Sequence, residues 1–293
     1  MVRPAAFGFH AEAARSNAFA APLDGQFSGA LREFETIAEQ LGEAGVEVLV
    51  LDDTANPAKP DAVFPNNWVS FHADGTMVLY PMATAARRLE RVPEALAQLL
   101  RREGFQVRRT VDLAAHESDG RFLEGTGSLI LDRPRRHAYA SRSVRTDASV
   151  VGAFDQALGY DTMVFDAFDR HGRPIYHTNV LLSLGTGFAI LCAVVVPEQQ
   201  RKPLIDRIEA TGRILIQVDY DQLRSFACNV IELHSDDGPV IALSSTALRS
   251  FTPDQGRRLE RFGRLVAADI PTIEAVGGGS VRCMIAEVHL PRV

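Results

Sequence analysis

The same order of predicted elements recurs about five times along the 293 residues of the chain. Each copy reads strand, turn, strand, helix, strand, at a period of roughly 50 residues. The turns carry residues that favour hairpins, such as Asp74-Gly75 and Gly185-Thr186-Gly187. Repeats of this size are typical of stacked or circular arrays. The repeat predicts an α/β ring of five ββαβ units, with residues 1–293 as a single domain; the alternative is a mixed α/β fold with irregular hairpins.

The two ends of the chain together supply the least regular copy. A short strand is predicted at residues 5–9, followed by a helix over about 28–43 and a buried strand over 46–51. Residues 284–290 predict a further strand without a helix of its own. We expect it to pair with the opening strand and close the ring. The helices expected in the other copies cover residues 87–102, 145–158, 197–211 and 253–267, the last followed by a strand near Ile273.

Composition limits the classes of function. The net charge is −6 and no block of Lys or Arg stands out, so nothing favours nucleic acid or an anionic membrane as a partner. The three cysteines are odd in number and lack CxxC spacing, which argues against a disulfide framework and a zinc site. No apolar run reaches the roughly 20 residues of a membrane span, and the N-terminus lacks a signal-peptide core. We expect a cytoplasmic enzyme, and the sequence leaves open its oligomeric state, including a homodimer.

A polar cluster falls near the start of the hairpin in each copy. Equivalent positions in a ring point at one central axis, so residues distant in sequence would meet there. Each residue also has an ordinary explanation as a turn, a helix cap or a core side chain. What sets these residues apart is that they occupy equivalent positions in successive copies of the repeat. The clusters are Asp61 to Trp68, Phe122 to Gly127, Tyr176 to Asn179, Phe226 to Asn229, and the closing run Gly277-Gly278-Gly279-Ser280-Val281-Arg282-Cys283.

The shared position of these clusters within the repeat predicts one site formed by Asn66 or Asn67 with Glu124, His177 and Cys283. A thiolate and an imidazole support nucleophilic catalysis, in which sulfur attacks an electrophilic carbon and the ring moves protons. A carboxylate in the same cavity can hold the N–H groups of a planar substrate and place its carbon near the sulfur. The combination suits a guanidinium or ureido carbon.

The chain resembles the pentein, or amidinotransferase, superfamily, which includes arginine deiminases and dimethylarginine dimethylaminohydrolases. The resemblance covers almost the whole chain and implies a five-bladed α/β propeller of ββαβ units. It is carried by the order and spacing of several short matches. These are Asp61-x-x-Phe64-x-Asn66-Asn67, Arg87-Arg88-x-Glu90, Leu123-Glu124-Gly125-x-Gly127 and Ser143-x-Arg145-Thr146, followed by His177 and Cys283.

The resemblance also implies roles. Cys283 would be the nucleophile, His177 the general acid and then base, and Glu124 the group that holds the substrate nitrogens. Arg145 and, less directly, Arg88 would bind the α-carboxylate of a small amino-acid substrate. It implies no metal and no cofactor. The remaining residues assigned to substrate binding are Asp61, which could instead be structural, and Phe64, Asn66, Asn67 and Asn179.

Two positions depart from the pattern of many relatives. Asn67 and Asn179 stand where those relatives have aspartate. An amide cannot match the charge of a guanidinium but can donate N–H to a carbonyl oxygen, so we expect a neutral ureido substrate. Citrulline fits best, with ornithine, ammonia and carbon dioxide as products, and the 64–68 run also resembles the citrulline-utilisation hydrolase (CtlX) branch. The alternatives are an arginine or dimethylarginine hydrolase, then an amidinotransferase, then a non-catalytic ring scaffold.

Overall fold

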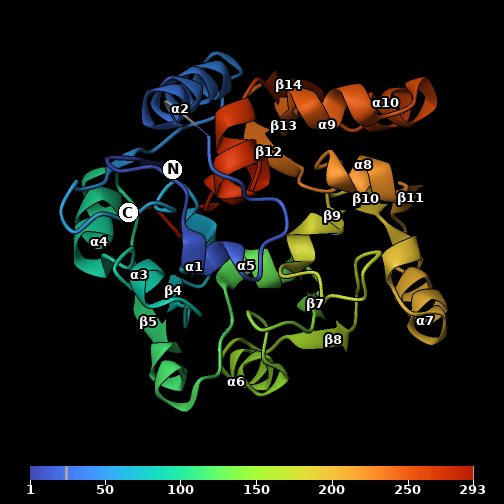
Figure 1. Cartoon of the computed structure of the whole chain (residues 1–293), viewed down its shortest axis with the longest axis horizontal. Coiled ribbons are helices and arrows are strands. Elements are labelled where there is room, and N and C mark those ends of the chain that lie inside the picture. The colour runs from blue at the N-terminus through green and yellow to red at the C-terminus, as the bar shows by residue number, and fades with distance from the viewer. Residues whose placement is uncertain (24–25, 293) are drawn as a thin grey trace.

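The structure is a computed structural model that describes residues 1–23 and 26–292. The described residues form five small sheets around a common centre, with most of the helices outside them (Figure 1). In four sheets the middle strand runs antiparallel to the strand before it and parallel to the strand after it. The helix lies between the two parallel strands, as a parallel connection requires. The prediction of a five-unit α/β ring is therefore confirmed.

The strands of the four three-stranded sheets are short. They are β3 (Val69–Phe71), β4 (Thr76–Leu79), β5 (Arg109–Asp112); β6 (Ile130–Asp132), β7 (His137–Ser141), β8 (Asp161–Phe165); β9 (Leu182–Leu184), β10 (Phe188–Leu191), β11 (Ile214–Gln217); and β12 (Ile231–Ser235), β13 (Gly238–Ser244), β14 (Arg264–Ala268). The fifth sheet pairs β1 (Val2–Arg3) with β2 (Leu51–Asp52). The helices are α1 (Ala11–Ala14), α2 (Gln26–Glu43), α3 (Ala85–Arg88), α4 (Pro93–Arg102), α5 (Gly125–Ser128), α6 (Ala148–Leu158), α7 (Glu198–Glu209), α8 (Tyr220–Arg224), α9 (Ser245–Ser250) and α10 (Pro253–Glu260).

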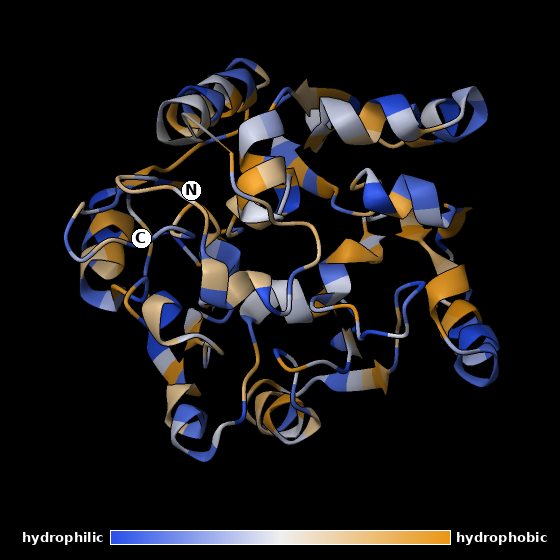
Figure 2. Ribbon diagram, in the orientation of Figure 1, coloured by the Kyte–Doolittle hydropathy of each residue, from blue (hydrophilic) through white to orange (hydrophobic). Residues whose placement is uncertain are grey.

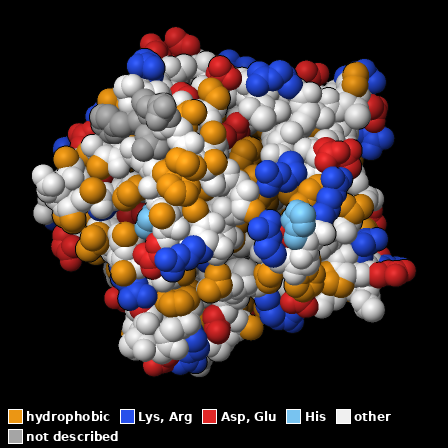
Figure 3. All heavy atoms as spheres, in the orientation of Figure 1, with side chains coloured by type: hydrophobic (Ala, Val, Ile, Leu, Met, Phe, Trp, Pro, Cys, Tyr) orange, Lys and Arg blue, Asp and Glu red, His pale blue; other side chains and the backbone are white. Residues whose placement is uncertain are grey.

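The outer helices bury one apolar face against the sheets. In α2 the fully buried residues are spaced three and four apart, Phe34, Ile37 and Leu41, as a single helix face requires. The apolar and polar stripes of these helices are visible in Figure 2. On the exposed face shown in Figure 3, acidic and basic side chains are interspersed. No helix in the described ranges is long and apolar enough to cross a bilayer.

Three predicted elements outside the first sheet were wrong. The helix expected over 87–102 is divided into α3 and α4, because Pro93 lacks the N–H of a helix interior and begins a new helix instead. The helix expected over 253–267 ends at Glu260. The strand follows at once as β14, where residues 264–268 pair with β13. Ile273 begins a π-helical turn, Ile273–Gly277, rather than a strand.

The predicted closure of the ring was also wrong. The opening strand is β1, at residues 2–3 instead of 5–9, and it ends before Pro4, which has no N–H for a ladder. Residues 284–290 form no strand in the described structure, and only Arg292 makes a bridge, with Phe105. The first sheet thus lacks the hairpin partner that the other four possess.

A short helical turn precedes the inner strand of several units. These turns are Pro65–Asn67, α5 and Thr178–Val180, and the turn Val281–Met284 occupies the closing position. They pack on one another at the centre of the ring, where α5 touches the turns at 65–67 and 178–180. Four of the five polar clusters singled out by the repeat lie on or directly before these turns, and the fifth, Phe226 to Asn229, lies between α8 and β12.

Candidate active site

The centre of the ring brings together side chains from separate units. Asn67, His177 and Cys283 line one small cavity, and Glu124 lies behind its wall in contact with His177. All four side chains are buried. Gly127 permits this approach, because a Cβ there would lie 2.5 Å from Asn67 Nδ2 and 2.8 Å from His177 Nδ1.

The Cys283 sulfur faces two amide groups. Asn179 and Asn229 each donate an N–H to Sγ at 3.3 Å. A thiolate can only accept hydrogen bonds, so two converging donors match its needs. The sulfur stands on the turn at 281–284, whose backbone is fixed by the bond from Cys283 N to the Ser280 carbonyl. Ser280 Oγ donates a buried hydrogen bond of 2.7 Å to Glu274 Oε1, which fixes the loop that precedes Cys283.

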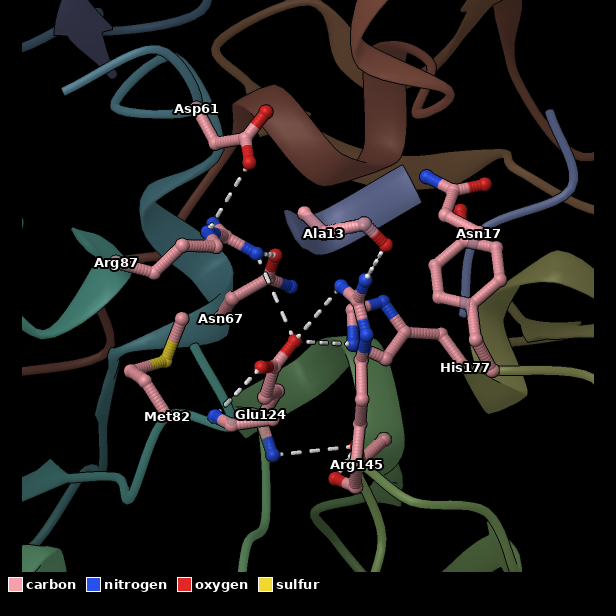
Figure 4. Close-up of polar contacts among 12 residues, drawn as sticks. Ala13, Asn17, Asp61, Asn67, Met82, Arg87, Glu124, Arg145 and His177 are labelled. Carbon is pink, nitrogen blue, oxygen red and sulfur yellow. Dashed lines mark hydrogen bonds and ion pairs between the residues drawn. The ribbon is translucent and has the colours of Figure 1, made fainter. Parts of the chain in front are cut away.

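Glu124 is the acceptor for three cationic or N–H-bearing side chains (Figure 4). Its Oε2 lies 2.8 Å from His177 Nε2, 3.2 Å from Arg145 Nη1 and 3.6 Å from Arg87 Nη1. Burial alone would raise the pKa of Glu124, but Arg145, the His177 bond and Arg87 outweigh it and hold that pKa well below its usual range. Glu124 is thus a carboxylate at neutral pH.

His177 is a neutral imidazole in this setting. Burial lowers the pKa of His177 to about 4, and the opposing effect of Glu124 does not restore it. Since the carboxylate can only accept, Nε2 carries the proton and Nδ1 keeps its lone pair. Nδ1 makes no hydrogen bond within the described structure, so it is free to take and return a proton.

Two buried arginines converge on the same cavity. Arg87 donates to Asn67 Oδ1 at 2.8 Å and pairs with both oxygens of Glu90. Burial would lower its pKa, but Glu90, Asp61 and Glu124 keep it raised, so it is always charged. Arg145 is held between Glu124 and the segment that covers the cavity.

The segment 10–20, which includes α1, covers the cavity. Arg145 Nη2 donates to the Ala13 carbonyl at 2.7 Å, and His10 Nδ1 lies 2.7 Å from Asp61 Oδ2. Asn17 donates to the carbonyls of Gly277 and Gly278, beside the thiol loop. The enclosed space is about 20 Å³, which is enough for about one water molecule. An amino acid therefore enters only after this cover moves.

Most of the residues predicted from sequence to bind substrate lie at the cavity, but Asn66 and Arg88 do not. Asp61, Phe64 and Arg145 line the cavity with Asn67, and Asn179 touches the sulfur. Asn66 is fully buried but does not line the cavity; its side-chain oxygen accepts from Asn67.

Arg88 lies outside the cavity, and Arg87 occupies the position expected of it. The Arg88 side chain is a third exposed and bonds to the Met82 carbonyl and Glu117. Both arginines stand in the same sequence motif, and they differ in the direction in which each side chain leaves the end of α3.

Sequence reasoning missed several residues at the site. The sequence offered a signal for Asn229, because this residue ends the polar cluster Phe226 to Asn229, which has the same position in its repeat as the other clusters have in theirs. His10 and Asn17 had none, since the covering segment stands outside the repeat. No group of three or more His, Cys, Asp or Glu side chains among residues 1–23 and 26–292 is placed to hold a metal ion.

Comparison with protein families gives a match over nearly the whole chain. The family described as N,N dimethylarginine dimethylhydrolase, eukaryotic, matches residues 3–290. No curated protein sequence matches the chain.

Solved structures share the fold at low identity. The N-terminal domain of ArgZ, an arginine dihydrolase from the ornithine–ammonia cycle in cyanobacteria, has a TM-score of 0.75 at 17% identity, over 99% of this chain and 98% of that domain. The chain covers 40% of full-length ArgZ. A dimethylarginine dimethylaminohydrolase has a TM-score of 0.66 at 16% identity, over 97% and 96% of the two chains. These likenesses establish the pentein fold.

The neutral state of His177 predicts a pH dependence of stability. An unfolded histidine titrates near 6.5, so between pH 7 and 5 the unfolded chain takes up a proton that folded His177 does not. The free energy of unfolding then falls as the pH falls, by roughly 2 kcal/mol for this residue. Urea unfolding at both pH values should show a larger loss for the unmodified chain than for His177→Asn. Equal losses of unfolding free energy in the two proteins would contradict a neutral His177 in the folded chain.

The two amides at the sulfur predict the reactivity of Cys283. We expect Asn229→Asp to slow alkylation of Cys283 by iodoacetamide about tenfold at pH 8, because a carboxylate repels the thiolate. Tenfold corresponds to about 1.4 kcal/mol. Asn229→Ala should slow it less. Peptide mass spectrometry measures the rate, and Cys192 and Cys228, whose pKa values burial raises, serve as unreactive internal controls. An unchanged rate in the aspartate variant would contradict a role for Asn229.

Proposed function

The chain belongs to the N,N dimethylarginine dimethylhydrolase family, and from this premise we propose that it hydrolyses a guanidino amino acid through a covalent bond to Cys283. Members of this family are hydrolases of amidine C–N bonds. Arginine and methylated arginines are the proposed substrates. We also propose that residues 1–293 act as one catalytic domain, since all five sheets contribute to the ring around the cavity.

The observation that carries the proposal is the convergence at the cavity. Cys283 and His177 line the same enclosed space, and the His177 ring is oriented by the Glu124 carboxylate. A nucleophile and a base whose orientation is fixed by a third group form the general arrangement of covalent catalysis. The two buried arginines add what an α-carboxylate requires, namely guanidinium donors in a dry setting.

The proposed reaction has two balanced halves. The Cys283 thiolate, its proton taken by His177 Nδ1, attacks the guanidinium carbon; the C–N bond to the leaving amine breaks, and His177 returns the proton to that amine. The product of this half is a thiouronium on the sulfur. His177 then takes a proton from water as the hydroxide adds to the carbon. The C–S bond breaks and the hydroxyl proton is lost to solvent, which releases a ureido amino acid and leaves the thiolate beside protonated His177.

Solved structures of similar proteins support a guanidino substrate. The ArgZ domain is an arginine dihydrolase, and a variant of AgrE is known with bound L-arginine. The charges around the cavity admit such a substrate but do not select it. The two guanidinium groups, Arg87 and Arg145, are matched by the carboxylates of Asp61 and Glu124. A third carboxyl group, Glu90, adds less than a full charge at neutral pH, because burial raises its pKa to about 7.

The second candidate is citrulline, in the manner of the citrulline-utilisation (CtlX) branch. It is favoured by the amides at Asn67 and Asn179, which stand where a guanidinium would meet aspartates. Attack of Cys283 on the ureido carbon would break the C–N bond to the side-chain nitrogen, which leaves as the amine of ornithine with a proton from His177, and would give an S-carbamoyl intermediate. Water would then break the C–S bond and release carbamate, which decomposes to ammonia and carbon dioxide. The overall products would be ornithine, ammonia and carbon dioxide. A dihydrolase of arginine would perform this second hydrolysis as well.

Product analysis tests the proposal and separates the candidates. We expect Cys283-dependent release of ammonia or a methylamine from arginine or dimethylarginine, measured with citrulline and ornithine by mass spectrometry. Cys283→Ser should abolish it. Ornithine formed from citrulline, with neither guanidino substrate consumed, would establish the second candidate instead. No turnover of any of the three would contradict both and favour amidino transfer or a scaffold.

The two arginine assignments give a matched pair of variants. Arg145→Lys should raise KM for the amino-acid substrate by about tenfold, because lysine cannot make the bidentate contact with a carboxylate. Arg88→Lys should leave KM unchanged, since Arg88 lies outside the cavity. Steady-state kinetics on the preferred substrate measures both. A large effect of Arg88→Lys with none at Arg145 would reverse the assignment.

A further inference from the structure

A second cavity lies on the outer side of the covering segment. Its volume is about 310 Å³, which is the size of a small-molecule site. Residues 14–16, 18 and 19 of the segment form one wall, and α8 and the chain at 173–176 form much of the rest. We call this space the outer cavity. Ala14 and Tyr176 line both the outer cavity and the cavity that holds Cys283, so the two spaces share a wall.

The outer cavity carries positive charge that no carboxylate neutralises. Among the residues that the structure describes, its charged lining is Arg15, Asp169, Arg173 and Arg224. Asp169 is paired with Arg173 at 2.7 Å, so these two charges cancel. Within residues 1–23 and 26–292, neither Arg15 nor Arg224 makes an ion pair, and both side chains are exposed. Basic side chains gather near α8 on the face shown in Figure 3.

The remaining wall of the outer cavity is aromatic and apolar. The Phe19 ring packs against Tyr176 and Phe226, with ring centres 6.3 and 5.2 Å apart. The Arg224 guanidinium lies over Phe19, 4.5 Å from the ring centre. The other apolar side chains of the wall are Val144, Pro174, Ile175 and Leu223. Two free guanidinium groups beside apolar surface suit a carboxylate with an aliphatic or planar body.

The two free arginines stand on different parts of the molecule. Arg15 directly follows α1 in the covering segment, whereas Arg224 is the last residue of α8 in the ring. Arg224 already reaches the segment, because its Nη1 donates to the Ala18 carbonyl at 3.4 Å. Like charges on the segment and the ring repel each other, and an anion between them removes that repulsion. A carboxylate held by both arginines would therefore stabilise the closed segment.

The same segment separates the outer cavity from Arg145. Ser16 lines the outer cavity, and its Oγ accepts hydrogen bonds from Arg145 Nε at 3.0 Å and Nη2 at 2.8 Å. The Tyr176 ring centre lies 5.1 Å from the same guanidinium. A ligand that fixes the segment from the outer side would thus preserve these contacts, and the inner cavity would stay closed.

We propose that the outer cavity binds a small organic carboxylate between Arg15 and Arg224, and that this ligand holds the covering segment closed. Ligands of this chemistry have two sources. One is the amino acid of the reaction, as substrate or product, and this source rests on the proposed function. The other is an unrelated carboxylic acid with an aromatic or aliphatic body.

Hydrogen exchange at the base of the covering segment tests the proposal. The Ala21 amide, directly after the segment, donates to the Ala275 carbonyl at 2.7 Å, a bond between the cover and the ring. A ligand that binds only the closed state favours that state by one plus the ratio of its concentration to Kd. Benzoate at about four times its Kd should therefore slow exchange of the Ala21 amide about fivefold, as measured by NMR.

Matched variants assign this effect to the outer cavity. Arg15→Gln and Arg224→Gln should each lose most of the slowing. Arg142→Gln should keep it, since Arg142 is an exposed arginine that pairs with Asp166 and lines neither cavity. Full slowing in Arg224→Gln would overturn the proposal. Equal slowing by sodium chloride at the same ionic strength would also overturn it, because the effect would then be charge screening alone.

The source of the ligand is decided by comparing acids. Arginine and citrulline are added to the Cys283→Ser chain, which should not consume them. Slowing by either amino acid that disappears when Arg224→Gln is added would identify the amino acid of the reaction as the ligand. Slowing by benzoate alone would identify an unrelated acid, and no slowing by any of the three would overturn the proposal. The benzoate result requires no turnover, so it stands or fails separately from the proposed function.

Discussion

The buried Glu124 carboxylate is the charge around which the centre of the ring is arranged. An ion removed from water is tolerated only when partners replace its hydration, and Glu124 has His177, Arg145 and Arg87 within 3.6 Å. The three partners come from different units of the repeat. The contacts with His177 and Arg87 therefore stabilise the carboxylate and also fix one unit against another, whereas Arg145 lies in the same unit as Glu124. The same carboxylate orients the His177 ring, while burial keeps that ring neutral.

The same network joins the site to its cover. Arg145 bonds at once to Glu124 and to the Ala13 carbonyl in the covering segment. A substrate carboxylate would compete for this guanidinium with a backbone carbonyl, which is the weaker, uncharged acceptor. Binding at Arg145 would then replace one of the contacts that hold the covering segment in place. This segment is bonded both to Arg145 and, through Asn17, to the loop that carries Cys283.

The repeat made the ring and the meeting of its central residues predictable, because equivalent positions in a closed array share one axis. It could not distinguish Arg87 from Arg88. Arg87 and Arg88 are the last two residues of α3, and adjacent residues of a helix point in different directions. It also could not reveal the incomplete first sheet, since the apolar pattern of residues 284–290 is that of a strand whether or not a partner is beside it. The covering segment has no counterpart in the other units, so His10 and Asn17 carried no signal.

The amides at positions 67 and 179 have tasks that do not depend on substrate charge. Asn179 donates to the Cys283 sulfur, where an aspartate could only repel a thiolate. Asn67 accepts from Arg87 and donates to Asn66, two bonds that a carboxylate could not make together. Their presence is therefore weaker evidence for a neutral substrate than the sequence suggested. The ionised groups do not favour a neutral substrate either, since the Glu124 and Asp61 carboxylates are matched by Arg145 and Arg87, and burial raises the pKa of Glu90 to about 7. A guanidino substrate is therefore proposed on the basis of the family to which the chain belongs.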